Sequence, residues 1–129
     1  MTRQVRLLFF TRTIDGNTCA MTRQILDELP PLSDKIAIDE INVVLERDKA
    51  TQYGVDRAPA IAITHEEAEG TITDSRIRFL GAPAGYEFMA LVRAILLVGG
   101  AESELTDDSR HRLAAVNRPV TMQVFTTPT

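Results

Sequence analysis

The stretch from Thr13 to Leu29, TIDGNTCAMTRQILDEL, contains the single cysteine of this chain, Cys19. It follows an apolar segment and precedes residues with helical spacing, so it falls in the first turn of an expected helix. A helix N-terminus stabilises a thiolate through its unpaired N–H groups and its dipole. Dithiol sites of the form Cys-x-x-Cys use such positions: the first cysteine attacks, and the second, one turn further in, resolves the mixed disulfide. Here Gly16 occupies the attacking position and Cys19 the resolving one.

The segment from Gly16 through Asn17 and Thr18 to Cys19 therefore reads GNTC in place of Cys-x-x-Cys. A chain with one cysteine can form neither an intramolecular disulfide nor a Cys-rich zinc site. Two interpretations of Cys19 remain, an inert and half-buried thiol or a monothiol that forms a mixed disulfide with glutathione. We expect the inert thiol, because reactivity requires both a stabilised thiolate and solvent access.

A second motif is the proline in VDRAPAIAI. Pro59 donates no ladder hydrogen bond, so it fits the first position or the edge of a strand. It is also a position at which a cis peptide bond can be retained. An ordinary trans proline fits the sequence equally well.

Composition limits the classes of partner. The net charge of -4 makes nucleic acid and anionic membranes poor electrostatic partners. The longest strongly apolar run, from Met89 to Val98, is interrupted by Arg93 and is too short to span a bilayer. No signal-peptide core is recognisable, and we expect a cytoplasmic protein. His65 and His111 lie in polar contexts, which favours surface histidines, and we expect neither a metal site nor a cofactor.

The hydrophobic pattern predicts an α/β domain with the order β-α-β-α-β-β-α. The first two strands, joined through a helix, must be parallel, and the short acidic loop between the last two predicts an antiparallel pair. The result is a central mixed β-sheet with helices on both faces. The inward positions of the first helix are expected at Met21, Ile25, Leu26 and Leu29. Those of the last helix, 86–98, are expected at Phe88, Leu91, Val92, Ile95 and Leu96. The expected strands are 5–10, 35–44, 59–64 and 76–80, and the shorter helices are 17–29 and 46–53.

The character of the chain changes after Gly100. Residues 102–116 predict a polar helix that Ser103 or Thr106 caps, and 120–125 predict a further strand. With an offset of 115 residues this strand repeats the start of the chain, Val120 matching Val5. We therefore expect a domain at 1–100 and, at 101–129, a linker helix and the first strand of a truncated second unit. An open apolar strand seeks an edge, so we expect it to pack on its own domain or on another copy, giving a homodimer.

Together these segments resemble the thioredoxin and glutaredoxin superfamily. The fuller resemblance is to the N-terminal unit of the glutaredoxin-like protein disulfide oxidoreductases, which have two thioredoxin-fold units in tandem. A flavoprotein component of alkyl hydroperoxide reductase similarly pairs a unit without the dithiol with one that has it. The resemblance covers about residues 3–129 and is carried by LSDKIAIDEINV, YGVDRAPAIAI, RFLGAPAGYEF and PVTMQVFTTPT.

The resemblance implies a thioredoxin fold, with Cys19 as the resolving cysteine and Pro59 as a cis-proline. Ala58 would then present its backbone to an extended partner. Gly16 departs from the family pattern, and the approach from Ile14 to Thr18 is one residue longer than usual.

The implied function is a redox-degenerate unit that serves as scaffold or docking surface for a protein thiol or disulfide partner, such as a second thioredoxin-like unit. Two alternatives stay open, a monothiol oxidoreductase that uses Cys19 and a peptide-binding module without redox activity.

Overall fold

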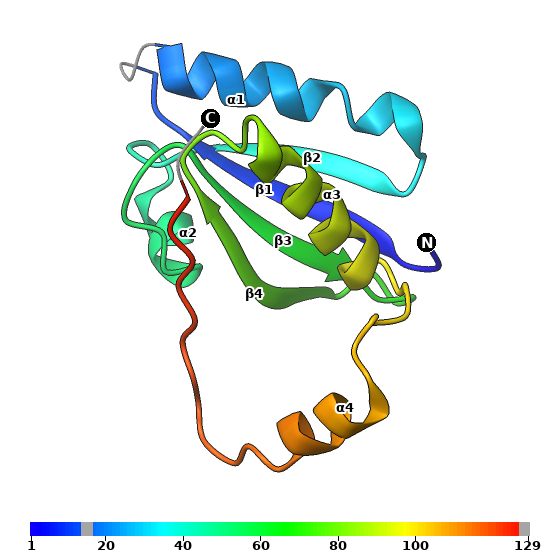
Figure 1. Ribbon diagram of the computed structural model, residues 1–129. Helices are drawn as coiled ribbons and strands as arrows, with labels where there is room; N and C mark the ends of the chain where they lie inside the picture. The colour runs from blue at the N-terminus through cyan, green and yellow to red at the C-terminus, as the bar shows by residue number, and fades with distance from the viewer. Residues whose placement is uncertain (14–16, 127–129) are drawn as a thin grey trace.

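The computed structural model of the chain describes residues 1–13 and 17–126 (Figure 1). Gly16, the expected attacking position, lies outside the described residues, as do Ile14 and Asp15. The elements are β1 (Gln4–Thr11), α1 (Asn17–Asp27), a 3-10 turn η1 (Pro30–Leu32), β2 (Ile36–Asn42), α2 (Arg47–Gln52), β3 (Ala60–Glu66), β4 (Ile72–Leu80), α3 (Tyr86–Val98) and α4 (Asp107–Ala114).

The four strands form one mixed sheet in the order β2-β1-β3-β4. β1 pairs in parallel with β2 and antiparallel with β3, and β3 pairs antiparallel with β4. The predicted element order and strand directions are confirmed. β1 is central because Val5 to Phe10 is apolar at nearly every position, which suits a strand that is buried on both faces.

Helices cover both faces of this sheet, as predicted (Figure 1). α1 and α3 lie on one face, where the side chains of Val5, Leu7 and Phe9 enter the core. α2 lies on the other face, over Leu8 and Phe10. The first core also contains Leu26, Leu29, Ile61, Ile63, Leu91, Ile95 and Val98, and the second Ile41, Ala50, Val55, Ala60 and Ala62.

α2 has six residues and leaves part of its sheet face uncovered. That part is polar: Arg6 on β1 bridges Asp39 on β2 at 3.0 Å and Glu66 on β3 at 3.3 Å. An ion pair that crosses three strands lets this face meet water without apolar exposure.

The inward stripe of α1 differs from the prediction at its start. Met21 is 48% exposed, whereas Cys19 and Thr22 are buried. The buried positions after them are Leu26 and Leu29, so the spacing of three, four and three is one helical face. The prediction followed hydrophobicity alone, and it missed a threonine that can turn inward because its Oγ1 donates to the Thr18 carbonyl at 2.8 Å.

α3 also presents a different face from the one predicted. Leu91, Ile95 and Val98 are buried, but Leu96 is 43% exposed and its inward assignment is wrong. Because almost every position of this helix is apolar, the sequence pattern does not predict which face is buried. Phe88 is half-buried and packs on the first core.

β4 is longer than predicted because it contains a bulge. Ile77 pairs with Ile63, but Asp74 pairs with Thr64, so Ser75 and Arg76 are extra residues on β4. Arg76 has a φ of +69°. The bulge interrupts the alternation of side chains, which explains why the residues before Arg76 gave no strand signal.

The segment 101–126, called the arm below, leaves the domain after α3. Its helix α4 is shorter than the predicted 102–116 and begins after Thr106, whose side chain accepts a hydrogen bond from Ser109 N. The predicted strand at 120–125 is wrong, because this part has no neighbouring strand with which to form a ladder. The prediction that it packs on its own domain is also wrong: Val120, Met122 and Phe125 are 68 to 89% exposed. Its assignment to a second unit stays a prediction.

Within the described residues, no helix is long and apolar enough to cross a membrane.

Arg78 attaches α2 to the sheet edge. Its guanidinium donates to the backbone carbonyl of Tyr53, just after α2, at 3.0 and 3.2 Å, and lies 5.8 Å from the centroid of the Tyr53 ring. It also pairs with the carboxylate of Asp74 at 2.7 Å. This hydrogen bond lowers the pKa of Asp74 below its ordinary value.

We predict that Asp74→Asn lowers the free energy of unfolding at pH 7 by about 1.5 kcal/mol, the lower end of the usual contribution of a hydrogen bond to a charged group, because the pair is partly exposed. Because the folded pKa of Asp74 is depressed, the stabilisation is present above the unfolded value of about 3.9 and is lost as the pH falls through the folded value. Urea unfolding from pH 7 down to pH 3 should show the gap between variant and parent closing. Asp56→Asn is the control, since its pair with Arg57 is 61 to 77% exposed and should contribute nothing measurable. A gap that is independent of pH would contradict the assignment.

Candidate functional site

Cys19 is the third residue of α1 and the first residue of its buried stripe. Its exposed fraction is 3%, whereas its neighbours Thr18 and Ala20 on the same turn are exposed. Asn17 is exposed as well. The thiol is therefore shielded because the helical phase that buries Leu26 also turns position 19 inward.

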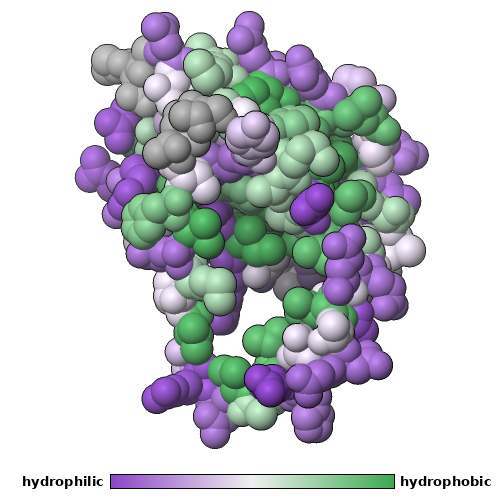
Figure 2. Space-filling view, viewed as in Figure 1, coloured by the Kyte–Doolittle hydropathy of each residue, from purple (hydrophilic) through white to green (hydrophobic). Residues whose placement is uncertain are grey.

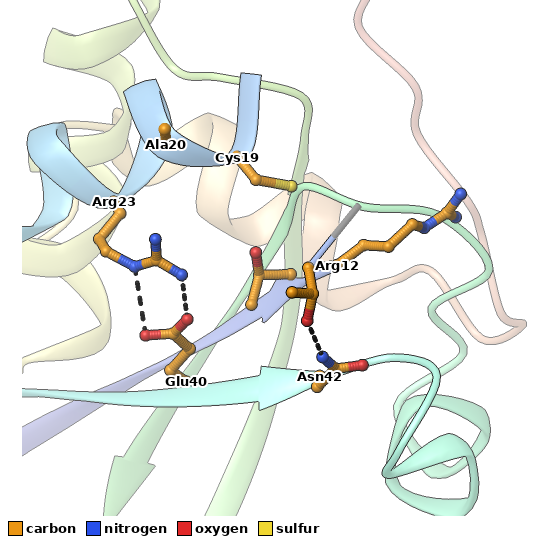
Figure 3. A pocket seen from close by; sticks show the side chains of 8 residues that line it. Arg12, Cys19, Ala20, Arg23, Glu40 and Asn42 are labelled. Carbon is orange, nitrogen blue, oxygen red and sulfur yellow. Dashed lines mark hydrogen bonds and ion pairs between the residues drawn. The ribbon is translucent and has the colours of Figure 1, made fainter. Parts of the chain in front are cut away.

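The Cys19 side chain borders a cavity of about 460 Å³ at the end of β1 and β2 (Figure 3). Three elements contribute: the end of β1 with the residues after it, the first turns of α1, and β2. Figure 3 shows the sulfur directed toward the β1 end of this space. The lining residues are Thr11, Arg12, Thr13, Cys19, Ala20, Arg23, Glu40 and Asn42.

Arg23, the first cationic residue after Cys19 on α1, forms an ion pair with a carboxylate of the sheet. Arg23, one turn after Cys19, forms a two-point ion pair with Glu40 of β2, with Nε 3.3 Å from Oε2 and a second bond from Nη2 to Oε1. The hydrogen bond to Glu40 raises the pKa of Arg23. The guanidinium also lies 5.9 Å from the centroid of the Phe9 ring. This pair connects α1 to β2 of the sheet.

The opposite wall of the cavity is fixed by hydrogen bonds. Asn42 donates from Nδ2 to the Thr13 hydroxyl at 2.8 Å, and its Oδ1 accepts from the backbone N–H groups of Val44 and Leu45. Arg12 is exposed, and its side chain extends away from Cys19 in Figure 3. Among the described residues that line the cavity there is no histidine, and the one carboxylate, Glu40, is paired with Arg23.

The peptide bond between Ala58 and Pro59 is cis. Pro59 is buried, and its carbonyl accepts a hydrogen bond from Gly81 N at 2.8 Å. Ala60, the next residue, pairs with Phe10 of β1, so this bond lies at the end of the sheet at which β1 leads toward α1. Ala58 is half-buried, and among the described residues its N–H and C=O groups make no hydrogen bond. They can pair with an extended segment from outside.

The two histidines do not belong to this site. His111 is exposed on α4. His65 lies on β3 with its side chain 13% exposed and its Nδ1 3.4 Å from Glu67 Oε1, so its prediction as a surface residue is wrong. In the described part of the chain no cluster of three metal-ligating side chains occurs.

The sequence analysis missed the ion pair between Arg23 and Glu40 and the hydrogen bonds by which Asn42 fixes one side of the cavity. Glu40 and Asn42 reach the cavity through the crossover between β1 and β2, and no local pattern marks such contacts. Arg23 had one available signal: it lies four residues after Cys19, hence on the same side of the helix.

No protein-family model matches the chain. Among curated proteins, a probable thioredoxin of Methanothermobacter thermautotrophicus is 32% identical over 75 residues, which are 57% of this chain and 76% of that protein. The alkyl hydroperoxide reductase component AhpF of Xanthomonas campestris pv. phaseoli is 35% identical over 116 residues, which are 84% of this chain and 19% of that protein.

Among solved structures, the NTD_N/C domain of the alkylhydroperoxide reductase AhpF from Enterococcus faecalis (V583) matches with a TM-score of 0.78 and 27% identity. The match covers 92% of this chain and 55% of that one. A protein disulfide oxidoreductase from Aeropyrum pernix K1 matches with a TM-score of 0.72 and 23% identity, over 89% of this chain and 48% of that one, and it supports the fold alone. The chain thus spans about half the length of these two structures.

The thioredoxin relative is matched over three quarters of its length, and the sheet order, the cis-proline and the helix that carries Cys19 agree with that relationship. The chain therefore belongs to the thioredoxin family, as a thioredoxin-like domain with one cysteine that resembles the N-terminal domain of AhpF.

Proposed function

We propose that this chain is a redox-degenerate thioredoxin-like domain that serves as a structural or docking unit of a larger disulfide oxidoreductase. The observation that carries the proposal is the burial of Cys19 as the first member of the inward stripe of α1, which is what a resolving position would require. A resolving thiol needs an attacking partner three residues earlier, and the sequence has Gly16 there. Without that partner the domain performs no intramolecular dithiol exchange.

The partner is a second thioredoxin-like unit. Similarity to the N-terminal domain of AhpF suggests such a pairing, and this chain spans only 55% of that structure. The end of the sheet at Ala58 and Pro59 is the docking edge. The backbone groups of Ala58, which make no hydrogen bond within the described residues, accept an extended segment by main-chain hydrogen bonding, a recognition mode that needs no thiol. The same feature supports the second candidate, a peptide-binding module without redox activity.

Monothiol exchange by Cys19 is less well supported. Attack by a thiolate requires access, and the side chain is 3% exposed. Arg23, one turn after Cys19 on α1, donates a hydrogen bond to the carboxylate of Glu40.

We predict that iodoacetamide at neutral pH labels Cys19 in the folded protein at least about 100-fold more slowly than in urea. This protection corresponds to a local opening cost of about 2.8 kcal/mol. The rates are measured by mass spectrometry. The control is the double variant Cys19→Ser with Ala20→Cys, which moves the thiol to an exposed position on the same turn and should be labelled rapidly. Equally fast labelling of Cys19 would favour the monothiol and overturn the proposal.

A second prediction concerns the resolving position. Gly16→Cys restores the Cys-x-x-Cys spacing, so we expect the variant to form an intramolecular disulfide with Cys19 in oxidised glutathione, with loss of two thiols and two hydrogens. Asn17→Cys is the matched control, because it adds a thiol one residue too close. Thiol titration and intact mass measure both. If Gly16→Cys keeps its two thiols, or if Asn17→Cys closes a disulfide equally well, Cys19 does not occupy the resolving position.

A further inference from the structure

The backbone that carries the docking edge is fixed on either side of Arg57 and Ala58 rather than at these two residues. Within the described part of the chain, the backbone groups of both make no hydrogen bond. Before them, the carbonyl of Tyr53 accepts two hydrogen bonds from a side chain. After them, the carbonyl of Pro59 accepts one from a backbone N–H group. The conformation at Ala58 therefore depends on the groups that donate these bonds.

Both sets of donors come from the end of β4. Arg78 donates from Nε and Nη2 to the Tyr53 carbonyl, at 3.2 and 3.0 Å. The N–H group of Gly81, just after β4, donates to the carbonyl of Pro59 at 2.8 Å. Tyr53 follows the last residue of α2, where backbone carbonyls lack a partner within the helix, so a guanidinium is a suitable donor there. One short stretch of chain thus holds both approaches to the docking edge.

The bulge in β4 brings a carboxylate within reach of Arg78. Asp74 and Arg78 are four residues apart on β4, but their partners on β3 are only two residues apart. In a regular strand they would be separated by about 13 Å along the strand axis, whereas the bulge reduces this separation to about 7 Å. The Asp74 carboxylate accepts from both Nη atoms of Arg78, at 2.9 and 2.7 Å. The bulge therefore fixes the direction of the Arg78 side chain.

Arg76, inside the bulge, has an unfavourable backbone conformation. Its φ is +69°, a region that residues with a Cβ rarely adopt. Its N–H group donates at 2.8 Å to Asp74 Oδ1, the oxygen that also accepts from Nη1 of Arg78. Such a conformation persists only where surrounding contacts fix it, and it is typical of sites that depend on pre-organised geometry. One carboxylate thus links the bulge to the orientation of Arg78.

We infer that Arg78 is a positioning residue for the docking edge. Together with Gly81 it holds residues 54–58 in one conformation, so that the backbone of Ala58 is ordered before a partner segment pairs with it. Order in the unbound state reduces the entropy that binding costs. The inference rests on the proposed function, in which Ala58 pairs with the partner, and it adds the group that prepares this pairing. Asp74 acts only through Arg78.

The test compares the backbone order of Arg57 and Ala58 in variants of the full chain, measured by ¹⁵N relaxation. In the parent chain we expect order parameters near the rigid-backbone value of about 0.85. Arg78→Met keeps an unbranched apolar side chain but removes every donor, so both order parameters should fall below about 0.6. Asp74→Asn leaves Arg78 in place but removes the charge that orients it, and it should give values between these two.

Ile77→Val is the matched control. Ile77 precedes Arg78 on β4 but pairs with Ile63 and packs against the first core, on the opposite face of the sheet. Helix α3 covers that face, and Figure 2 shows apolar surface over the position that α3 has in Figure 1. The substitution removes one methylene group from this core and lowers the global stability without touching Arg78. The order parameters of Arg57 and Ala58 should therefore stay at the parent values.

Order parameters that are equal in the parent, Arg78→Met and Asp74→Asn would overturn the inference. A loss of order in Ile77→Val as large as in Arg78→Met would also overturn it, because the mobility would then follow global stability. If Arg78→Met does not fold, the comparison of Asp74→Asn with Ile77→Val decides. None of these measurements involves a partner. A negative result leaves the proposed docking function in place, and a chain that binds no partner would leave the order parameters as expected.

Discussion

The burial of β1 on both faces is the constraint on which the rest of this structure depends. Its side chains alternate between two cores, one under α1 and α3 and the other under α2. A central strand of this kind must have neighbours on both sides, and it has β2 in parallel and β3 antiparallel. The parallel pair requires a crossover, and that crossover is α1. The position of the only cysteine follows from this helix.

The chemistry of the site is set by the helical phase of α1 rather than by its N-terminus. A helix N-terminus favours a thiolate, but the phase that buries Leu26 and Leu29 also buries the sulfur of Cys19. The neighbouring Arg23 is held by Glu40, which ties α1 to β2. The peptide bond before Pro59 is cis, and within the described residues the backbone groups of Ala58 make no hydrogen bond.

The two edge strands of the sheet, β4 and β2, differ from the arm in how their surfaces resist pairing with another strand. The bulge at Ser75 and Arg76 breaks the β4 edge, and Asp39 and Glu40 place charge on the β2 edge, so neither invites indiscriminate strand addition. The arm has no such protection. Residues 119–126 combine alternating apolar residues with an absence of charge.

The sequence by itself determined the element order, the strand directions and the position of the thiol in the first turn of α1. These follow from local signals: apolar runs of strand length, β-branched residues, and the glycines and prolines that end the elements. The resemblance to a known superfamily added the expectation of a cis bond at Pro59. Tertiary structure decided what local signals leave degenerate. Nearly every position of α3 is apolar, so only packing could choose Val98 over Leu96 for the core. Glu40 meets Arg23 because a crossover brings β2 beside α1, a contact that no periodicity records. Residues 120–125 have the pattern of a strand but not its structure, because a strand exists only where a neighbour supplies hydrogen bonds.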